Sequence, residues 1–133
     1  MSTTARERIA GLSLLRRPGA APPFVLLHGI GSDAESWSPL LRLLDPARAV
    51  IAWDAPGYGG SDALAEAAPT PQAYATKLAG LLEALGIPRA ILVGHSLGAL
   101  FAARFAAGWP DRMAAVALIS PALGNGVAPE APL

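Results

Sequence analysis

The sequence predicts an α/β domain with a doubly wound, mostly parallel sheet. Short apolar runs at residues 24–27, 49–53 and 90–93 alternate with segments of helical spacing. Strands that alternate with helices are joined by crossovers into a parallel sheet with helices on both faces. The runs are apolar throughout rather than alternating with polar residues, which is typical of strands that are buried on both faces.

The composition fits one domain of modest size with a buried core. The chain has 133 residues, of which 53% are hydrophobic and 15% charged. Ten basic and ten acidic residues give a net charge of zero, which argues against nucleic acid or an anionic membrane surface as a partner. With no cysteine and only two histidines, we expect no metal site and no cofactor. The sequence shows no signal-peptide pattern and no apolar run of about 20 residues, so we expect a cytoplasmic location.

We divide the chain into three stretches by composition. Residues 1–22 are expected to be a polar lead-in, with a possible weak strand over residues 11–16. Residues 23–121 hold the alternating strands and helices of the core. Residues 122–133 are rich in Pro, Gly and Ala and are expected to be an unstructured tail.

The first core strand, at residues 24–27, is broken by the glycine-containing residues 29–31. A helix is expected to begin near Ser36 or Ser38 and to end before Pro46. The second strand, at residues 49–53, follows this helix.

The second helix has clear start and stop signals. Thr70 is a suitable N-cap, and Pro71 occupies the first helical position. From Tyr74 onward, apolar residues recur at helical spacing and form one face, and Gly86 ends the helix. A last strand is expected near residues 114–119.

The most informative motif is Gly94-His95-Ser96-Leu97-Gly98, between the strand at residues 90–93 and a helix over residues 97–107. It reads Gly-x-Ser-x-Gly. A serine in so sharp a strand-to-helix turn has a strained backbone and an outward hydroxyl, and the flanking glycines leave room for the turn. We therefore predict that Ser96 is a catalytic nucleophile.

A second motif supplies candidate donors for the oxyanion that forms when a serine attacks a carbonyl. His28-Gly29-Ile30-Gly31 directly follows the first core strand. A strand-to-helix turn with a serine nucleophile at its apex is a nucleophile elbow, and in it one donor is the backbone N–H after the nucleophile, here that of Leu97. The other comes from the loop after the His-Gly strand, and Ile30 is our candidate.

The chain contains no evident general base for Ser96. Its two histidines, His28 and His95, do not follow the serine in the chain. We expect His28 to hold the oxyanion loop by hydrogen bonds, and His95 to pack away from the nucleophile. Trp37 is interpreted as a core residue, with a wall of the substrate pocket as the alternative. The loop at residues 54–61 lacks the spacing of a nucleotide site and is interpreted as structural.

With these motifs the chain resembles the α/β-hydrolase superfamily, and in particular the small bacterial esterases, enol-lactonases and carbon–carbon bond hydrolases. The matching blocks are His28-Gly29 with Trp37, the Asp-x-Pro-Gly-x-Gly-x-Ser loop at residues 54–61, the elbow at residues 94–98, and the turn at residues 109–112. The resemblance implies an eight-stranded, mostly parallel sheet, of which this chain would hold the strands up to about the sixth. The cap, the last two strands and the loops that carry the acid and histidine would be missing.

The resemblance implies a serine hydrolase that acts on a small ester or lactone through an acyl-serine intermediate. The alternative from another class is an inactive fragment or an interaction module, and a third is complementation by a second polypeptide. A chain that ends after the sixth strand would leave a parallel edge open. We therefore expect self-association through this edge strand.

Overall fold

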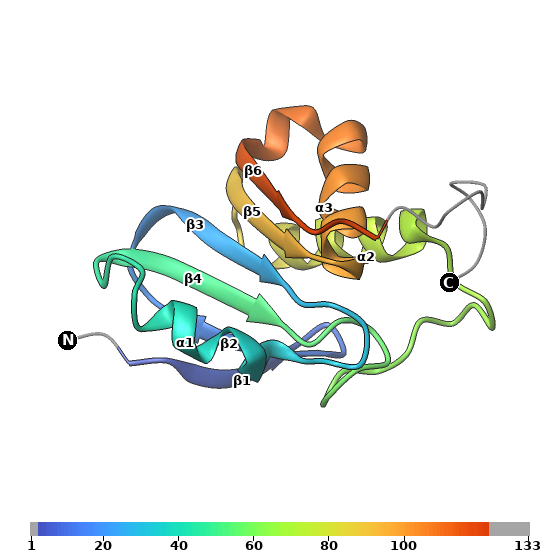
Figure 1. Ribbon diagram of the computed structural model, residues 1–133, viewed down its shortest axis with the longest axis horizontal. Helices are drawn as coiled ribbons and strands as arrows, with labels where there is room; N and C mark the ends of the chain where they lie inside the picture. Colours follow the sequence, from blue (N-terminus) through green and yellow to red (C-terminus); the bar gives the residue numbers. More distant parts are fainter. Residues whose placement is uncertain (1–2, 123–133) are drawn as a thin grey trace.

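The computed structural model describes residues 3–122 and places a six-stranded sheet between helices on its two faces (Figure 1). The strands are β1 (Ala5–Ile9), β2 (Leu12–Arg17), β3 (Ala20–Leu27), β4 (Arg48–Trp53), β5 (Ala90–His95) and β6 (Met113–Ile119). Their order across the sheet is β1-β2-β4-β3-β5-β6. Strands β4, β3, β5 and β6 run parallel, and the β1–β2 and β2–β4 pairs are antiparallel. The α/β class and the mostly parallel core of the sheet are thereby confirmed.

The expected lead-in is a β-hairpin that belongs to the sheet. The strand expected at residues 11–16 is present as β2, but its leucines Leu12 and Leu14 are fully buried, so it is a core strand rather than a weak one. β1 was not predicted, because charged residues occupy its centre, as is common in an exposed edge strand. The turn between β1 and β2 has positive φ at both Ala10 and Gly11, which matches a tight hairpin turn.

The first predicted helix is much shorter than expected. A 3-10 turn, η1 (Ala34–Trp37), leads into α1 (Ser38–Leu41), and the chain then leaves the helix well before Pro46. The buried guanidinium of Arg17 binds the carbonyl oxygens of Leu41, Asp45 and Arg48. These bonds hold the segment after Leu41 as a loop, so the leucine-rich run does not continue as one helix.

The second helix, α2 (Pro71–Ala84), follows its sequence signals. The Thr70 hydroxyl accepts a hydrogen bond from the Ala73 N–H at 3.3 Å, as an N-cap should. Tyr74 and Leu78 lie on its buried face. Beyond the helix, Gly86 has a φ of 68°, the left-handed conformation that commonly ends a helix.

Two separate cores lie on the two faces of the sheet. The larger core lies between the sheet and the helices α2 and α3 (Leu97–Gly108), where the rings of Tyr74 and Phe101 stack at 4.4 Å. The smaller core lies under η1 and α1 and includes Trp37 and Leu41. No helix within residues 3–122 is long and apolar enough to cross a membrane.

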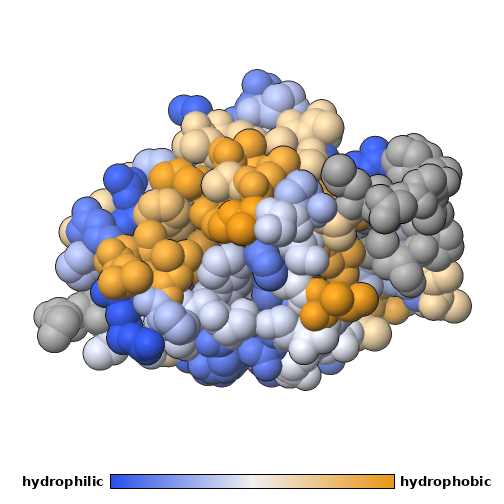
Figure 2. All heavy atoms as spheres, in the orientation of Figure 1, coloured by the Kyte–Doolittle hydropathy of each residue, from blue (hydrophilic) through white to orange (hydrophobic). Residues whose placement is uncertain are grey.

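Strand β6, which follows the short turn η2 (Pro110–Arg112), forms one edge of the sheet. Val116, Leu118 and Ile119 are 43–45% exposed there. Figure 2 shows apolar surface gathered over β3, β5 and β6 on the viewed face. Among residues 3–122, no strand pairs with the outer side of β6. The expected tail, residues 122–133, lies almost wholly outside the described residues.

Candidate active site

Ser96 lies at a sharp turn between β5 and α3. Its φ of 55° and ψ of −114° are a conformation that residues with a side chain rarely adopt. The Ser96 N–H donates to the carbonyl oxygen of Ile119 at 2.9 Å, and its own carbonyl accepts from Ala99 at 3.1 Å and Ala122 at 3.2 Å. The structure therefore has the strand-to-helix turn that the motif predicts, with a strained serine at its apex.

The glycines on either side of Ser96 are required by close packing. A Cβ at Gly94 would lie 2.4 Å from the carbonyl oxygen of Gly98. A Cβ at Gly98 would lie 2.1 Å from the carbonyl oxygen of Leu27, at the end of β3. The turn can form only because neither position carries a side chain.

Ser96 opens into a pocket of about 350 Å³ at the carboxyl ends of the parallel strands. The pocket is lined by His28, Gly29, Ile30, Ser32, Ser36, Trp37, His95, Ser96 and Ile119. Its volume suits a small organic molecule. A larger hollow of about 580 Å³ lies at the opposite, amino ends of the strands, and no histidine lines it. We therefore take the smaller pocket as the candidate active site.

The two predicted oxyanion donors lie around this pocket. Leu97 is the first residue of α3, so its N–H is one of those that lack a partner within a helix. Ile30 lines the pocket within a turn that is closed by a 3.2 Å hydrogen bond from the Ser32 N–H to the Gly29 carbonyl. A Cβ at Gly29 would lie 3.2 Å from the Ser96 Cβ, so this loop passes directly beside the nucleophile. Their role as oxyanion donors stays a prediction.

His28 holds the loop after β3, as expected. Its ring is buried, and Nε2 accepts a hydrogen bond from the Ala55 N–H at 2.9 Å. Nδ1 lies 2.8 Å from the Gly29 carbonyl oxygen, so Nδ1 carries the proton and donates it to this bond. Burial lowers the pKa of His28, although the Gly29 carbonyl and the charges of Asp54 and Asp33 act the other way. With both ring nitrogens engaged, His28 is not available as a base for Ser96.

The depressed pKa of His28 predicts a loss of stability in acid. Below about pH 6.5 an unfolded histidine gains a proton, while the folded ring stays neutral until its own lower pKa is reached. The contribution of the neutral His28 ring to the free energy of unfolding should therefore be complete above this pH. Below it, the free energy of unfolding should fall by up to about 1.4 kcal/mol per pH unit. Urea unfolding between pH 4.5 and 8 measures the slope. His28→Gln should have a shallower slope, and an unchanged slope would contradict the assignment.

His95 lies nearer the site than we expected. A Cβ added at Gly29 would lie 3.4 Å from the His95 Nδ1 and 3.2 Å from the Ser96 Cβ, so both side chains border the same point of the loop. His95 therefore lines the pocket beside the nucleophile, and the expectation that it packs away is wrong. No hydrogen bond joins the His95 ring to Ser96 among residues 3–122, so the part of the chain that the structure describes shows no assembled base.

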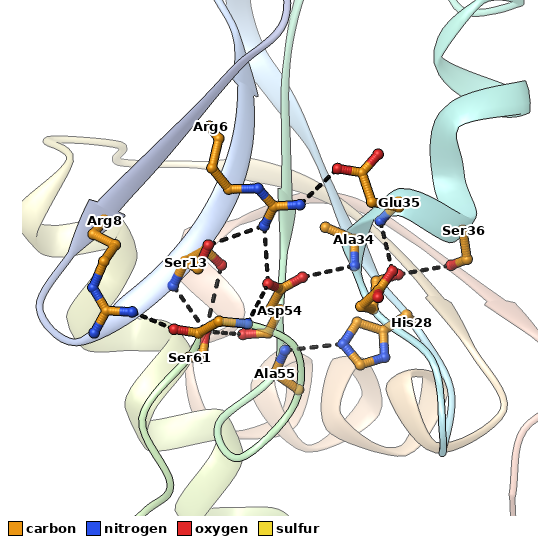
Figure 3. A network of polar contacts seen from close by, with 12 residues as sticks. Arg6, Arg8, Ser13, His28, Ala34, Glu35, Ser36, Asp54, Ala55 and Ser61 are labelled. Carbon is orange, nitrogen blue, oxygen red and sulfur yellow. Dashed lines mark hydrogen bonds and ion pairs between the residues drawn. The ribbon is translucent and has the colours of Figure 1, made fainter.

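Asp54, which directly follows β4, belongs to the loop motif at residues 54–61, but no role for its side chain was predicted from the sequence. Its side chain is only 3% exposed and fixes the loops around the pocket (Figure 3). Oδ1 accepts from the Ala34 N–H at 2.9 Å, and Oδ2 accepts from the Gly60 N–H at 2.9 Å. The Ser61 hydroxyl also donates to the Asp54 carbonyl oxygen at 2.6 Å. These bonds support the interpretation of residues 54–61 as a structural loop.

Asp54 also binds Arg6, which reaches across from the edge strand β1 (Figure 3). The Arg6 Nη1 donates to Asp54 Oδ2 at 2.9 Å and to the Ser13 hydroxyl at 3.0 Å, and Nη2 donates to Glu35 Oε1 at 2.7 Å. Burial of Arg6 works against its charge, but the hydrogen bonds and charges of Glu35 and Asp54 outweigh burial and raise its pKa. One guanidinium thus bridges two carboxylates.

Trp37 belongs to both the core and the pocket. It is buried in the smaller core, as predicted, but it also lines the pocket beside Ser96. Its indole N–H has no hydrogen-bond partner among the described residues. Within the same residues, no group of three or more His, Asp or Glu side chains is placed to hold a metal ion.

The comparisons with known proteins agree with the fold of the chain. The family model of the alpha/beta hydrolase fold matches residues 22–132. The chain is 40% identical over 105 residues to a 2-hydroxy-6-oxononadienedioate/2-hydroxy-6-oxononatrienedioate hydrolase of Burkholderia vietnamiensis, covering 76% of this chain and 36% of the relative. It is 37% identical over 111 residues to a 2-hydroxy-6-oxo-6-phenylhexa-2,4-dienoate hydrolase of Burkholderia cepacia, covering 80% of this chain and 39% of the relative.

Solved structures give the same result. An esterase from Mycobacterium tuberculosis superposes with a TM-score of 0.77 at 33% identity, over 89% of this chain and 41% of that chain. The chain therefore spans about two fifths of the length of the proteins that it matches.

Proposed function

The chain belongs to the alpha/beta hydrolase fold family, and on this premise we propose that it carries the nucleophile of a serine hydrolase. The substrate would be a small carboxylic ester or lactone, cleaved through an acyl-serine intermediate. The observation that carries the proposal is the strained Ser96 at the strand-to-helix turn, beside the glycine loop of the pocket. Names of matched proteins support hydrolysis as the reaction type, since they include dienoate hydrolases and an esterase.

The proposed reaction begins when the Ser96 hydroxyl attacks the carbonyl carbon of the substrate. The hydroxyl proton passes to a histidine base, and the carbonyl oxygen becomes an oxyanion near the N–H groups of Ile30 and Leu97. The oxyanion then collapses, and the histidine returns its proton to the leaving alcohol. The same histidine takes a proton from water, which attacks the acyl-serine, and passes it to the Ser96 oxygen as the carboxylic acid leaves. We propose that the base and its acid come from outside residues 1–133, from the same protein or from a second polypeptide. A cytoplasmic location remains part of this proposal.

Replacing Ser96 by alanine should abolish covalent labelling by a fluorophosphonate and hydrolysis of p-nitrophenyl acetate. The reason is that no other group in the pocket would be an activated nucleophile. In the natural protein, the intact mass after treatment measures covalent labelling, and the rate of p-nitrophenyl acetate cleavage measures hydrolysis. Ser32→Ala is the matched control, because Ser32 lines the same pocket. Labelling that persists in Ser96→Ala, or that is absent from the natural protein, would contradict the proposed function.

The open edge of β6 favours a second candidate, an interaction module without turnover. Two observations on this strand support it. Within residues 3–122 no strand pairs with its outer side, and its apolar side chains Val116, Leu118 and Ile119 are exposed. The intact mass of the protein from its source separates the candidates. A mass well above 13.5 kDa favours a hydrolase of which this chain is a part, and a mass of 13.5 kDa favours the module or complementation.

A lysine at the centre of β6 should reduce self-association of this chain. Val116→Lys places a charge on the open edge, where it opposes strand pairing between copies. Light scattering of the 133-residue chain should show oligomers for the native sequence and a shift toward monomer for the variant. Leu43→Lys is the control, because Leu43 is 83% exposed in the loop after α1. A native chain that is monodisperse and monomeric would contradict self-association.

A further inference from the structure

The loop that carries Ile30 is held at both ends by two consecutive residues, Asp54 and Ala55. At its start, the His28 ring accepts the Ala55 N–H at 2.9 Å. At its end, the Ala34 N–H donates to Asp54 Oδ1, also at 2.9 Å. Between these points the chain is rich in glycine, and Gly31 has a φ of 70°. The position of the Ile30 N–H therefore depends on how firmly the two ends are fixed.

Arg6 fixes the end of the loop at Ala34 through two carboxylates. Its Nη1 binds Asp54, which holds the Ala34 N–H, and its Nη2 binds Glu35, the next residue along the chain. The planar guanidinium has the fork geometry needed to hold two carboxylates at once. A residue of the edge strand β1, which does not line the pocket, is thus coupled to the end of the loop (Figure 3).

We propose that Arg6 is a positioning residue for the oxyanion loop, acting through Asp54 and Glu35. This inference rests on the proposed serine hydrolase function. Arg6 does not line the pocket, so it acts on the reaction only through the placement of the Ile30 N–H. An oxyanion donor contributes mainly in the transition state, so loosening it lowers kcat more than it changes KM.

A purely structural role would give a different result. The Arg6–Glu35 pair is 38% and 60% exposed and adds little to stability, whereas Asp54 is only 3% exposed, so loss of Arg6 also lowers stability by leaving that carboxylate without its cation. A change that acts through stability alone would speed exchange throughout the domain and not mainly in the loop. Arg8 offers a matched control, because it lies two residues along the same strand. It binds the Gly60 carbonyl and Asp62, and it makes no hydrogen bond or ion pair with the loop from His28 to Glu35.

The test compares Arg6→Ala, Arg6→Lys and Arg8→Ala in the natural protein by two measurements. Hydrogen exchange of the amides from Gly29 to Ala34 reports on the loop without any need for activity. Ester hydrolysis gives kcat and KM separately. We expect Arg6→Ala to speed exchange and to lower kcat by about tenfold, since a whole oxyanion donor is worth about 100-fold or more. Arg6→Lys should give exchange rates and a kcat between those of the native protein and Arg6→Ala, because an ammonium cannot bridge both carboxylates. Arg8→Ala should change neither the loop exchange nor kcat.

The two measurements separate failure of this inference from failure of the proposed function. Loop exchange that is unchanged in Arg6→Ala, or raised equally in Arg8→Ala, overturns the positioning role. Faster exchange with an unchanged kcat also overturns it. A natural protein without ester hydrolysis contradicts the proposed function, and hydrogen exchange then still decides whether Arg6 positions the loop.

Discussion

Gly98→Ala is expected to prevent the turn at Ser96 from forming and to destabilise the whole domain. The added Cβ would lie 2.1 Å from the Leu27 carbonyl oxygen and 2.6 Å from the His28 carbonyl oxygen. Both oxygens belong to the backbone, so neither can rotate away as a side chain would. Relief requires β3 and α3 to move apart, which we expect to cost about 3 kcal/mol or more. That is a large share of the stability of a typical domain, about 5–15 kcal/mol.

Urea unfolding followed by circular dichroism measures this loss. Gly80→Ala in α2 is the matched control, because a Cβ there would have no atom within 4 Å apart from its chain neighbours and the backbone of its own helix. Alanine is favoured over glycine in a helix, so this variant should gain about 0.5–1 kcal/mol. A Gly98→Ala protein that is as stable as the native protein would show that β3 and the elbow are packed less tightly than the structure indicates.

The features that the sequence predicted well are those set by neighbouring residues. The N-cap and the apolar face of α2 are set by residues of one helix, and the turn at Ser96 is set by the five consecutive residues of the Gly-x-Ser-x-Gly motif. Buried parallel strands are likewise recognised from short apolar runs. In each case the residues that determine the structure are close in the chain.

The features that were missed depend on residues far apart in the chain. Arg17 ends α1 by binding carbonyl oxygens more than twenty residues away, and no local pattern in the leucine-rich run shows this. His95 was placed wrongly because its position depends on how closely Gly29 approaches the elbow. Asp54 was quoted as part of a motif, but its partners Arg6 and Ala34 could be identified only from the folded structure.

Asp54→Ala is expected to be among the most damaging changes to a polar residue of this chain. It leaves the N–H groups of Ala34 and Gly60 without their acceptor, and it removes the buried partner of Arg6. The Ala34 N–H is buried, and an unsatisfied buried group costs about 1–3 kcal/mol, whereas Gly60 is exposed and its N–H can bind water instead. Because Arg6 is partly exposed and can turn to water, we expect a total loss of about 3 kcal/mol rather than the larger cost of a fully buried broken pair.

Urea unfolding of Asp54→Ala beside Asp62→Ala tests this expectation. Asp62 lies in the same loop and also pairs with an arginine, Arg8, but its side chain is 72% exposed, so its loss should cost less than about 1 kcal/mol. Asp54→Asn keeps the shape and one acceptor oxygen, but it turns an amide N–H₂ toward groups that are themselves donors. It should therefore recover only part of the lost stability. Equal losses for Asp54→Ala and Asp62→Ala would mean that burial at the end of β4 adds nothing, and that Asp54 does not fix the loops around the pocket.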